Sequence, residues 1–173
     1  LVIMTPKSLL RHKLCVSNIE DFTKGSSFHR VLYDDAEIGH SETKLAPDDK
    51  IKRVVLCSGK VYFDLLEERD ARGIDDIYLM RVEQLYPIAN IALREELARF
   101  KNADFIWCQE EPQNQGAWLF FGPHIERILT EVGAKKSRPG YAGRPPAAAP
   151  ATGQASKHKE QQAALVNEAL TLE

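Results

Sequence analysis

The 173-residue sequence lacks the features that mark several common classes of protein. None of its apolar runs approaches the about 20 residues that cross a bilayer, so we expect no membrane association. A net charge of -2 gives no electrostatic basis for binding nucleic acid. Residues 1–4 are too short for the apolar core of a signal peptide. With 43% hydrophobic and 28% charged residues, the sequence is typical of a globular domain.

Cysteine and histidine are too few and too scattered to indicate a metal centre. Cys15, Cys57 and Cys108 are odd in number and share no CxxC spacing, which argues against a disulfide framework or a zinc site. Cys57 and Cys108 each end an apolar run, so we interpret both as reduced core thiols. The five histidines form no HxH or HExxH pair. We expect no metal site and, since no nucleophile stands beside a base, no catalytic residue.

The central part of the chain alternates between short apolar runs and helical spacing. Residues 54–57, 77–82 and 105–108 are predicted strands. Between them, apolar residues predict one helix from Val61 to near Gly73 and another over 89–100. Strands that alternate with helices favour right-handed crossovers. The sequence therefore predicts an α/β fold, with a mostly parallel sheet as the middle of three αβα layers.

The first 50 residues are less regular. Because the chain has no initiator Met and starts in an apolar stretch, 1–4 is a predicted strand that continues an upstream segment, and 1–173 is expected to be a single domain of a longer polypeptide. A helix is predicted over 7–14, a second short helix is capped by Ser17, and a weak strand covers 28–33. The acidic segment 34–50 is a predicted surface loop that tolerates insertion.

The last third of the chain mixes helical spacing with prolines. Apolar residues over 125–132 predict a helix, which Gly122-Pro123 either starts or kinks if it begins near Gly116. The prolines of 138–153 favour an extended segment with a short strand near Tyr141. Ser156 is the predicted N-cap of a final helix.

The run from Cys108 to Trp118 crowds carboxyl and amide side chains into a short stretch. Pro112 and Gly116 predict that a buried strand stops at once in a loop, at the sheet edge where α/β folds place working loops. Adjacent strand residues point to opposite faces, so Glu110 and Glu111 do not suit acid–base chemistry on one atom. Aromatic and amide side chains are typical of a subunit contact. The candidate interface residues are Glu110, Glu111, Asn114, Gln115 and Trp118.

Ser58-Gly59-Lys60 joins a predicted strand to a predicted helix. Backbone N–H groups at the helix start and the Lys60 ammonium would favour a phosphate there. Neither GxGxxG nor GxxxxGK[ST] is present, so the glycine alternatively serves only the turn. Other basic side chains would suit the phosphates of a nucleotide or coenzyme A if later segments fold over the same edge. They are Arg81, Arg138, Arg144, Lys157 and His158.

Five motifs begin, in this order, at Met4 (MTPKSLLRH), Cys57 (CSGKVY), Arg81 (RVEQLYP), Trp107 (WCQEEPQNQGAW) and Tyr141 (YAGRP). Together they resemble the carboxyl-terminal domain of the first, decarboxylating component of the 2-oxoglutarate dehydrogenase complex. The resemblance implies a transketolase-like domain of an enzyme that uses thiamine diphosphate and Mg²⁺ to decarboxylate 2-oxoglutarate. The succinyl group then passes to the lipoyl arm of the second component, in the citric acid cycle.

The resemblance also implies what this domain does within the enzyme. Other domains would hold the cofactor, while this one, non-catalytic alone and binding no cofactor, would help to assemble the homodimer. Implied partners are dihydrolipoyl succinyltransferase and dihydrolipoyl dehydrogenase, in a bacterial cytoplasm or a mitochondrial matrix. Some members of the family bind acetyl-CoA or a nucleotide such as AMP at this domain, which makes Ser58-Gly59-Lys60 a candidate effector site.

Two roles for the domain stay open from the sequence. It is either a dimerisation module, which would also suit a related thiamine-dependent 2-oxo acid dehydrogenase, or a regulatory ligand-binding domain. A free-standing small enzyme is disfavoured, because the nucleophile and the metal ligands are missing.

Overall fold

Five strands form the sheet that organises the chain, and a computed structural model describes residues 1–23 and 25–172. The strands β1 (Val31–Leu32), β2 (Arg53–Cys57), β3 (Ile77–Val82), β4 (Asp104–Pro112) and β5 (Gly140–Arg144) lie in the order β1-β3-β2-β4-β5. β2 to β5 run parallel, and β1 pairs antiparallel with β3. The predicted mostly parallel sheet is confirmed.

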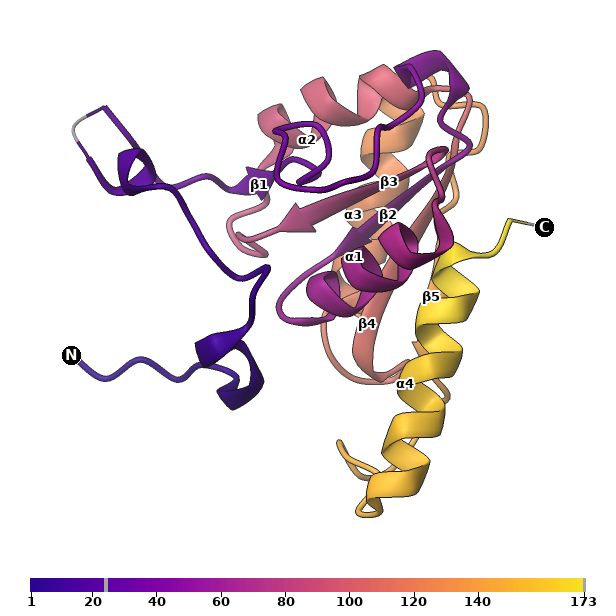
Figure 1. The fold of residues 1–173 in the computed structure, drawn as a ribbon. Coiled ribbons are helices and arrows are strands. Elements are labelled where there is room, and N and C mark those ends of the chain that lie inside the picture. Colours follow the sequence, from indigo (N-terminus) through magenta and orange to yellow (C-terminus); the bar gives the residue numbers. More distant parts are fainter. Residues whose placement is uncertain (24, 173) are drawn as a thin grey trace.

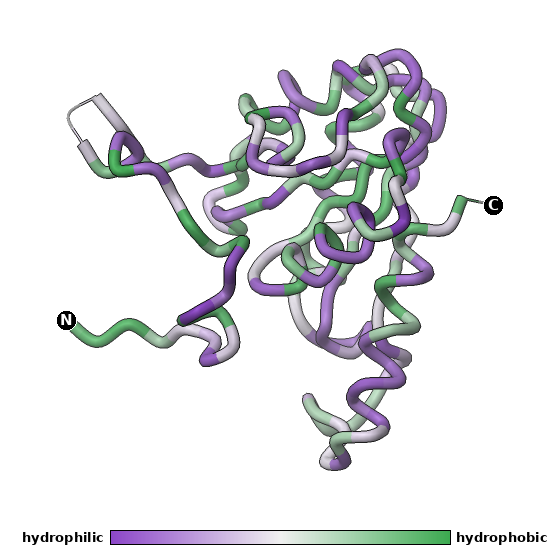
Figure 2. Tube along the Cα trace, in the orientation of Figure 1, coloured by the Kyte–Doolittle hydropathy of each residue, from purple (hydrophilic) through white to green (hydrophobic). Residues whose placement is uncertain are grey.

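Helices cover both faces of this sheet (Figure 1). One face packs against α1 (Val61–Arg72) and α4 (Ala155–Leu170), the other against α2 (Asn90–Leu97) and α3 (Trp118–Glu131). Successive strand residues serve opposite faces, so Val54 and Val55 belong to different cores. Figure 2 shows the apolar residues concentrated along the central strands. The three-layer αβα architecture is therefore confirmed.

The first 30 residues differ from the sequence prediction. Residues 1–4 are exposed and form no strand, since no neighbouring strand lies beside them to complete the hydrogen bonds. The predicted helix over 7–14 is the short 3-10 helix η1 (Lys7–Arg11). The second, η2 (Ile19–Phe22), starts after Asn18 and not Ser17, because Asn18 exchanges capping hydrogen bonds with Asp21. The strand predicted over 28–33 shrinks to β1.

The segment 34–50 contains one short 3-10 helix, η3 (Asp48–Lys50), and is otherwise irregular. Its start is not at the surface, however, because the side chain of Asp34 is fully buried and Asp35 is 7% exposed. The prediction of a surface loop was therefore wrong for these two residues.

Strand β4 runs through the polar residues where the sequence predicts a loop. β2 accompanies it only as far as Cys108, and β5 pairs with it up to Pro112. Pro112 is tolerated because β2 has already ended, so its missing N–H leaves no carbonyl of that strand unpaired. α3 begins at Trp118 and continues through Pro123. α4 begins after Gln154, with Ser156 already inside the helix.

The two core thiols predicted from the sequence are confirmed as free and buried, while Cys15 is exposed. Burial raises the pKa of Cys57 to about 12 and that of Cys108 well above its usual value, so both remain unreactive thiols at neutral pH. No helix of the described residues is long and apolar enough to span a membrane.

Candidate functional site

The loops singled out by sequence meet at the carboxyl edge of the sheet. β2 and β4 are parallel neighbours whose pairing ends at Cys57 and Cys108, so the residues that follow these two positions lie close together. Lys60, the residue before α1, pairs its ammonium with the carboxylate of Glu110 in β4. The turn is sharp because Gly59 adopts a φ of 77°, which favours glycine. The glycine–lysine turn and the start of the polar run thus share one edge.

A chain of polar contacts extends from Lys60 across the α1 and α4 face. Lys60 lies 3.9 Å from the Asp64 carboxylate one helical turn later. Asp64 accepts a hydrogen bond of 2.8 Å from Gln162 in α4. Gln162 in turn accepts one of 3.1 Å from Arg144 at the end of β5, which also donates to Nδ1 of His158 at 2.8 Å. We call these residues, with Glu110, the edge network.

The two cations of the edge network are balanced differently. The Lys60 ammonium faces two carboxylates, Glu110 and Asp64. Arg144 is 6% exposed, and among the described residues its guanidinium hydrogen-bonds the side chains of His158 and Gln162 and no carboxylate. A buried guanidinium without a carboxylate partner is costly, because charge is expensive to remove from water. Arg144 is therefore the member of the network best suited to meet an anion.

Arg81 and Arg138 do not join this network. Arg81 lies over the Tyr62 ring, 4.2 Å from its centroid, and 3.6 Å from the Asp35 carboxylate, in a groove of about 400 Å³. Burial raises the pKa of Asp35, while the charge of Arg81 opposes that rise. Arg138 precedes β5 and lines a groove with α3, on the opposite face of the sheet. Lys157 is exposed in the first turn of α4.

The remaining polar run is held together by Gln109, whose side chain is buried. Its amide oxygen accepts hydrogen bonds from the Trp107 indole (2.9 Å) and the Trp118 backbone (3.0 Å). Its amide nitrogen donates to the carbonyls of Glu111, Pro112 and Gln115. The sequence signal for this role is the position of Gln109 between two tryptophans, because a buried indole N–H needs a hydrogen-bond acceptor nearby.

Most of the candidate interface side chains contact other residues of the same chain. Asn114 and Gln115 bind the backbone of Ala147, at 3.0 to 3.1 Å. The Trp118 ring packs on Tyr141, with centroids 5.2 Å apart. Glu111 is exposed. Three of the five candidates therefore hold the loop against the rest of the domain.

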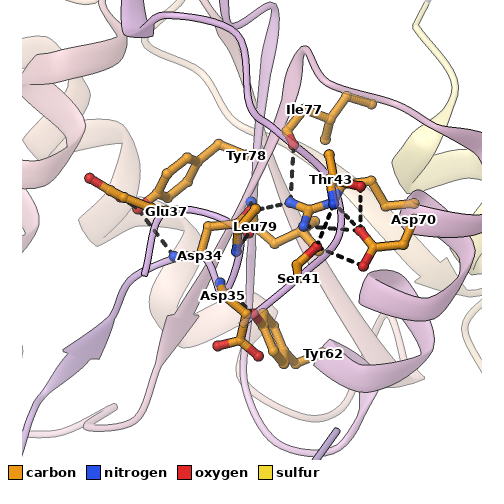
Figure 3. Close-up of polar contacts among 12 residues, drawn as sticks. Asp34, Asp35, Glu37, Ser41, Thr43, Tyr62, Asp70, Ile77, Tyr78 and Leu79 are labelled. Atoms are coloured by element: carbon orange, nitrogen blue, oxygen red, sulfur yellow. Dashed lines mark hydrogen bonds and ion pairs between the residues drawn. The ribbon is translucent and has the colours of Figure 1, made fainter. Parts of the chain in front are cut away.

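A second buried polar cluster, absent from the sequence predictions, surrounds Asp34 (Figure 3). The Asp34 carboxylate pairs with Arg69 of α1, and both side chains are fully buried. It also accepts the Leu79 backbone N–H at 2.6 Å. The carboxylate of Asp70, next to Arg69 in sequence, accepts hydrogen bonds of 2.7 Å from the hydroxyl groups of Ser41 and Thr43. These contacts fasten the segment 34–50 to α1 and β3.

Known proteins match this chain over almost its whole length. A family model described as 2-oxoglutarate dehydrogenase C-terminal covers residues 16–170. The chain belongs to this family. It is 58% identical over 171 residues to the 2-oxoglutarate dehydrogenase E1 components of Brucella anthropi and Brucella ovis, and 57% identical to that of Brucella abortus. Each alignment covers 98% of this chain and 17% of the relative.

Membership of the family agrees with the resemblance drawn from the five motifs and with the αβα fold. The relatives are named as an enzyme component, and this chain spans only 17% of their length. Among the described residues, no group of three His, Cys, Asp or Glu side chains is placed to hold a metal ion. We assign no catalytic step to the described residues.

Proposed function

We propose that this chain serves as the carboxyl-terminal domain of an enzyme that oxidatively decarboxylates 2-oxoglutarate and transfers the succinyl group to a lipoyl group. The observation that carries the proposal is the 58% identity over 171 residues to 2-oxoglutarate dehydrogenase E1 components. Thiamine diphosphate and Mg²⁺ would be held by other parts of the longer enzyme. Dihydrolipoyl succinyltransferase and dihydrolipoyl dehydrogenase would be its partners, in a bacterial cytoplasm.

Within that enzyme the domain would support assembly of a homodimer and carry no catalytic residue. A graft tests this role: the matching carboxyl-terminal segment of the Brucella anthropi relative is deleted or replaced by this chain. We expect deletion to abolish dimer formation and 2-oxoglutarate decarboxylation, and the graft to restore both. The chain alone should show no decarboxylation. A deletion variant that stays dimeric and fully active would contradict the proposal.

The edge network supports a second role, the binding of an effector phosphate such as that of acetyl-CoA or AMP. Arg144 lacks a carboxylate partner among the described residues, and contacts through Gln162 and Asp64 link it to Lys60. A bound phosphate would replace Glu110 as the ion-pair partner of the Lys60 ammonium. Because Arg138 lies on the opposite face and Arg81 contacts Asp35, the narrower set for this role is Ser58, Gly59, Lys60, Arg144, Lys157 and His158.

We expect Lys60→Ala to weaken effector binding about tenfold, since a charge-assisted hydrogen bond to the phosphate is lost. Isothermal titration of the longer enzyme with acetyl-CoA and with AMP measures this. Arg138→Ala is the matched control and should bind as the wild type does. Equal affinities for wild type and Lys60→Ala would remove the effector role and leave the proposed assembly role untouched.

A further inference from the structure

The two halves of α4 are held to the domain by different kinds of contact. The buried apolar side chains of this helix all lie in its second half, at Leu165, Val166, Ala169 and Leu170. Residues 155–160 are exposed, and Figure 1 shows the start of α4 extending beyond the ends of the strands. Because apolar burial fixes only the second half, the position of the first half depends on polar contacts.

Among the described residues, two side chains join the first half of α4 to other elements by hydrogen bonds. Gln162 donates to Asp64 of α1 and accepts from Arg144 of β5. His158, one turn earlier, contacts Arg144 at 2.8 Å. The next anchor toward β5 is Ala147, whose backbone binds two amide side chains of the loop before α3. The start of the helix is therefore fixed by the contact between His158 and Arg144.

This contact can form in only one protonation state of the imidazole. A guanidinium donates hydrogen bonds and has no acceptor, so Nδ1 of His158 must accept and carries no proton. A protonated ring has a proton on both nitrogens, which removes the acceptor and sets two cations against each other. Arg144 is 6% exposed and has no carboxylate partner among the described residues, so no carboxylate there offsets the repulsion. His158 itself is exposed, so protons reach it from the solvent.

The other charged groups around His158 do not replace this contact. A groove of about 530 Å³ between α1 and α4 places His158 beside three carboxylates and two cations. They are Asp64, Glu67, Glu68, Arg72 and Lys159. Each of the three carboxylates already contacts a donor within the chain, and their side chains are 41%, 58% and 44% exposed, so an ion pair with a protonated His158 would add little. Toward β4, Lys60 and Glu110 pair with each other.

We propose that the contact between Arg144 and His158 is a proton-sensitive latch, which holds the first half of α4 against β5 when His158 is neutral and releases it when His158 is protonated. Release would also free the mostly exposed segment 148–157, because the next anchor is Ala147. Histidine side chains gain a proton between about pH 5 and 8, so the latch operates in that range. It needs no effector, but it changes the contacts of Arg144, which belongs to the set proposed to bind one.

Hydrogen exchange of the α4 amides, measured by mass spectrometry on this chain at about pH 8 and about pH 5.5, tests the latch. Protection factors correct for the pH dependence of intrinsic exchange. Over residues 158–162 they should fall about tenfold at the lower pH, the size expected for the loss of one hydrogen bond to a charged group. Residues 165–170, which include the buried apolar side chains, should keep their protection.

Two variants show whether His158 is the group that titrates. His158→Asn keeps an acceptor near the position of Nδ1 but cannot be protonated, so protection over 158–162 should be the same at both pH values. His158→Lys places a permanent cation beside Arg144 and should show the low protection already at the higher pH. His29→Asn, at an exposed histidine before β1, is the matched control and should lose protection as the wild type does. A wild type that keeps its protection at the lower pH, an equal loss in His158→Asn, or full protection of His158→Lys at the higher pH would overturn the latch.

Discussion

Replacing Asp34 with alanine is expected to lower the free energy of unfolding by about 3–5 kcal/mol. The Asp34 carboxylate is the fully buried partner of Arg69, whose side chain is also fully buried. Removing it leaves a guanidinium inside the protein with only Asp70, at 3.3 Å, to balance its charge. The backbone N–H groups of Ala36 and Leu79 lose their acceptor as well. Urea unfolding followed by tryptophan fluorescence measures the loss.

Two further variants show whether the buried charge is the cause. Asp49→Ala, in the same segment but exposed, should change the free energy of unfolding by no more than about 0.5 kcal/mol. Adding Arg69→Met to Asp34→Ala should recover at least about 1 kcal/mol, because the unpaired charge is gone. If Asp34→Ala is no more destabilising than Asp49→Ala, the buried pair does not fasten the segment 34–50.

The parts of the fold that the sequence predicts well are those set by local pattern. Residues 77–82 are predicted as a strand and form β3 to the residue, because an apolar run interrupted only by Arg81 follows the helix-ending Gly73 and two aspartates. Gly73 ends α1 as predicted, with a φ of 62°. The three-layer architecture follows from the order of these elements alone.

The parts that the sequence does not predict depend on partners far along the chain. Whether 109–112 continues β4 is decided by β5, whose first residue is Gly140. The burial of Asp34 depends on Arg69, which lies 35 positions later. From its sequence neighbours alone, a charged residue such as Asp34 is predicted to be exposed. No residue close to Asp34 in the sequence indicates that it pairs with Arg69. The apolar residues 1–4 fail as a strand for the same reason, since no partner strand lies beside them.

The candidate site shows the same division. The parallel sheet predicts that Lys60 and Glu110 share the carboxyl edge, and the ion pair between them agrees. Which other basic residues contact Lys60 and Glu110 depends on the face of the sheet on which each later segment lies. Arg144 returns to the α4 side, while Arg138 turns toward α3. Arg138 and Arg144 are only six positions apart in the sequence, yet they lie on opposite faces of the sheet.

Gln109→Leu is expected to destabilise the protein by about 3 kcal/mol or more, and to loosen the loop before α3 in particular. Leucine fills a similar volume but removes both the acceptor for Trp107 and Trp118 and the donor for three carbonyls. Buried polar groups left without partners cost about 1–3 kcal/mol each when water cannot reach them. Gly116 sits against this amide, where a Cβ would lie 2.9 Å from the Gln109 nitrogen, so the loop has been shaped around it.

The matched control is Gln113→Leu, four positions further along the chain, because it makes the same chemical change at a side chain outside the Gln109 contacts. It should alter the free energy of unfolding by less than about 1 kcal/mol. Hydrogen exchange locates the effect: the Trp118 amide should exchange faster in Gln109→Leu than in the control, since its acceptor is the Gln109 oxygen. Equal exchange at Trp118 in both variants would mean that the loop is held by its backbone contacts, with Gln109 only filling space.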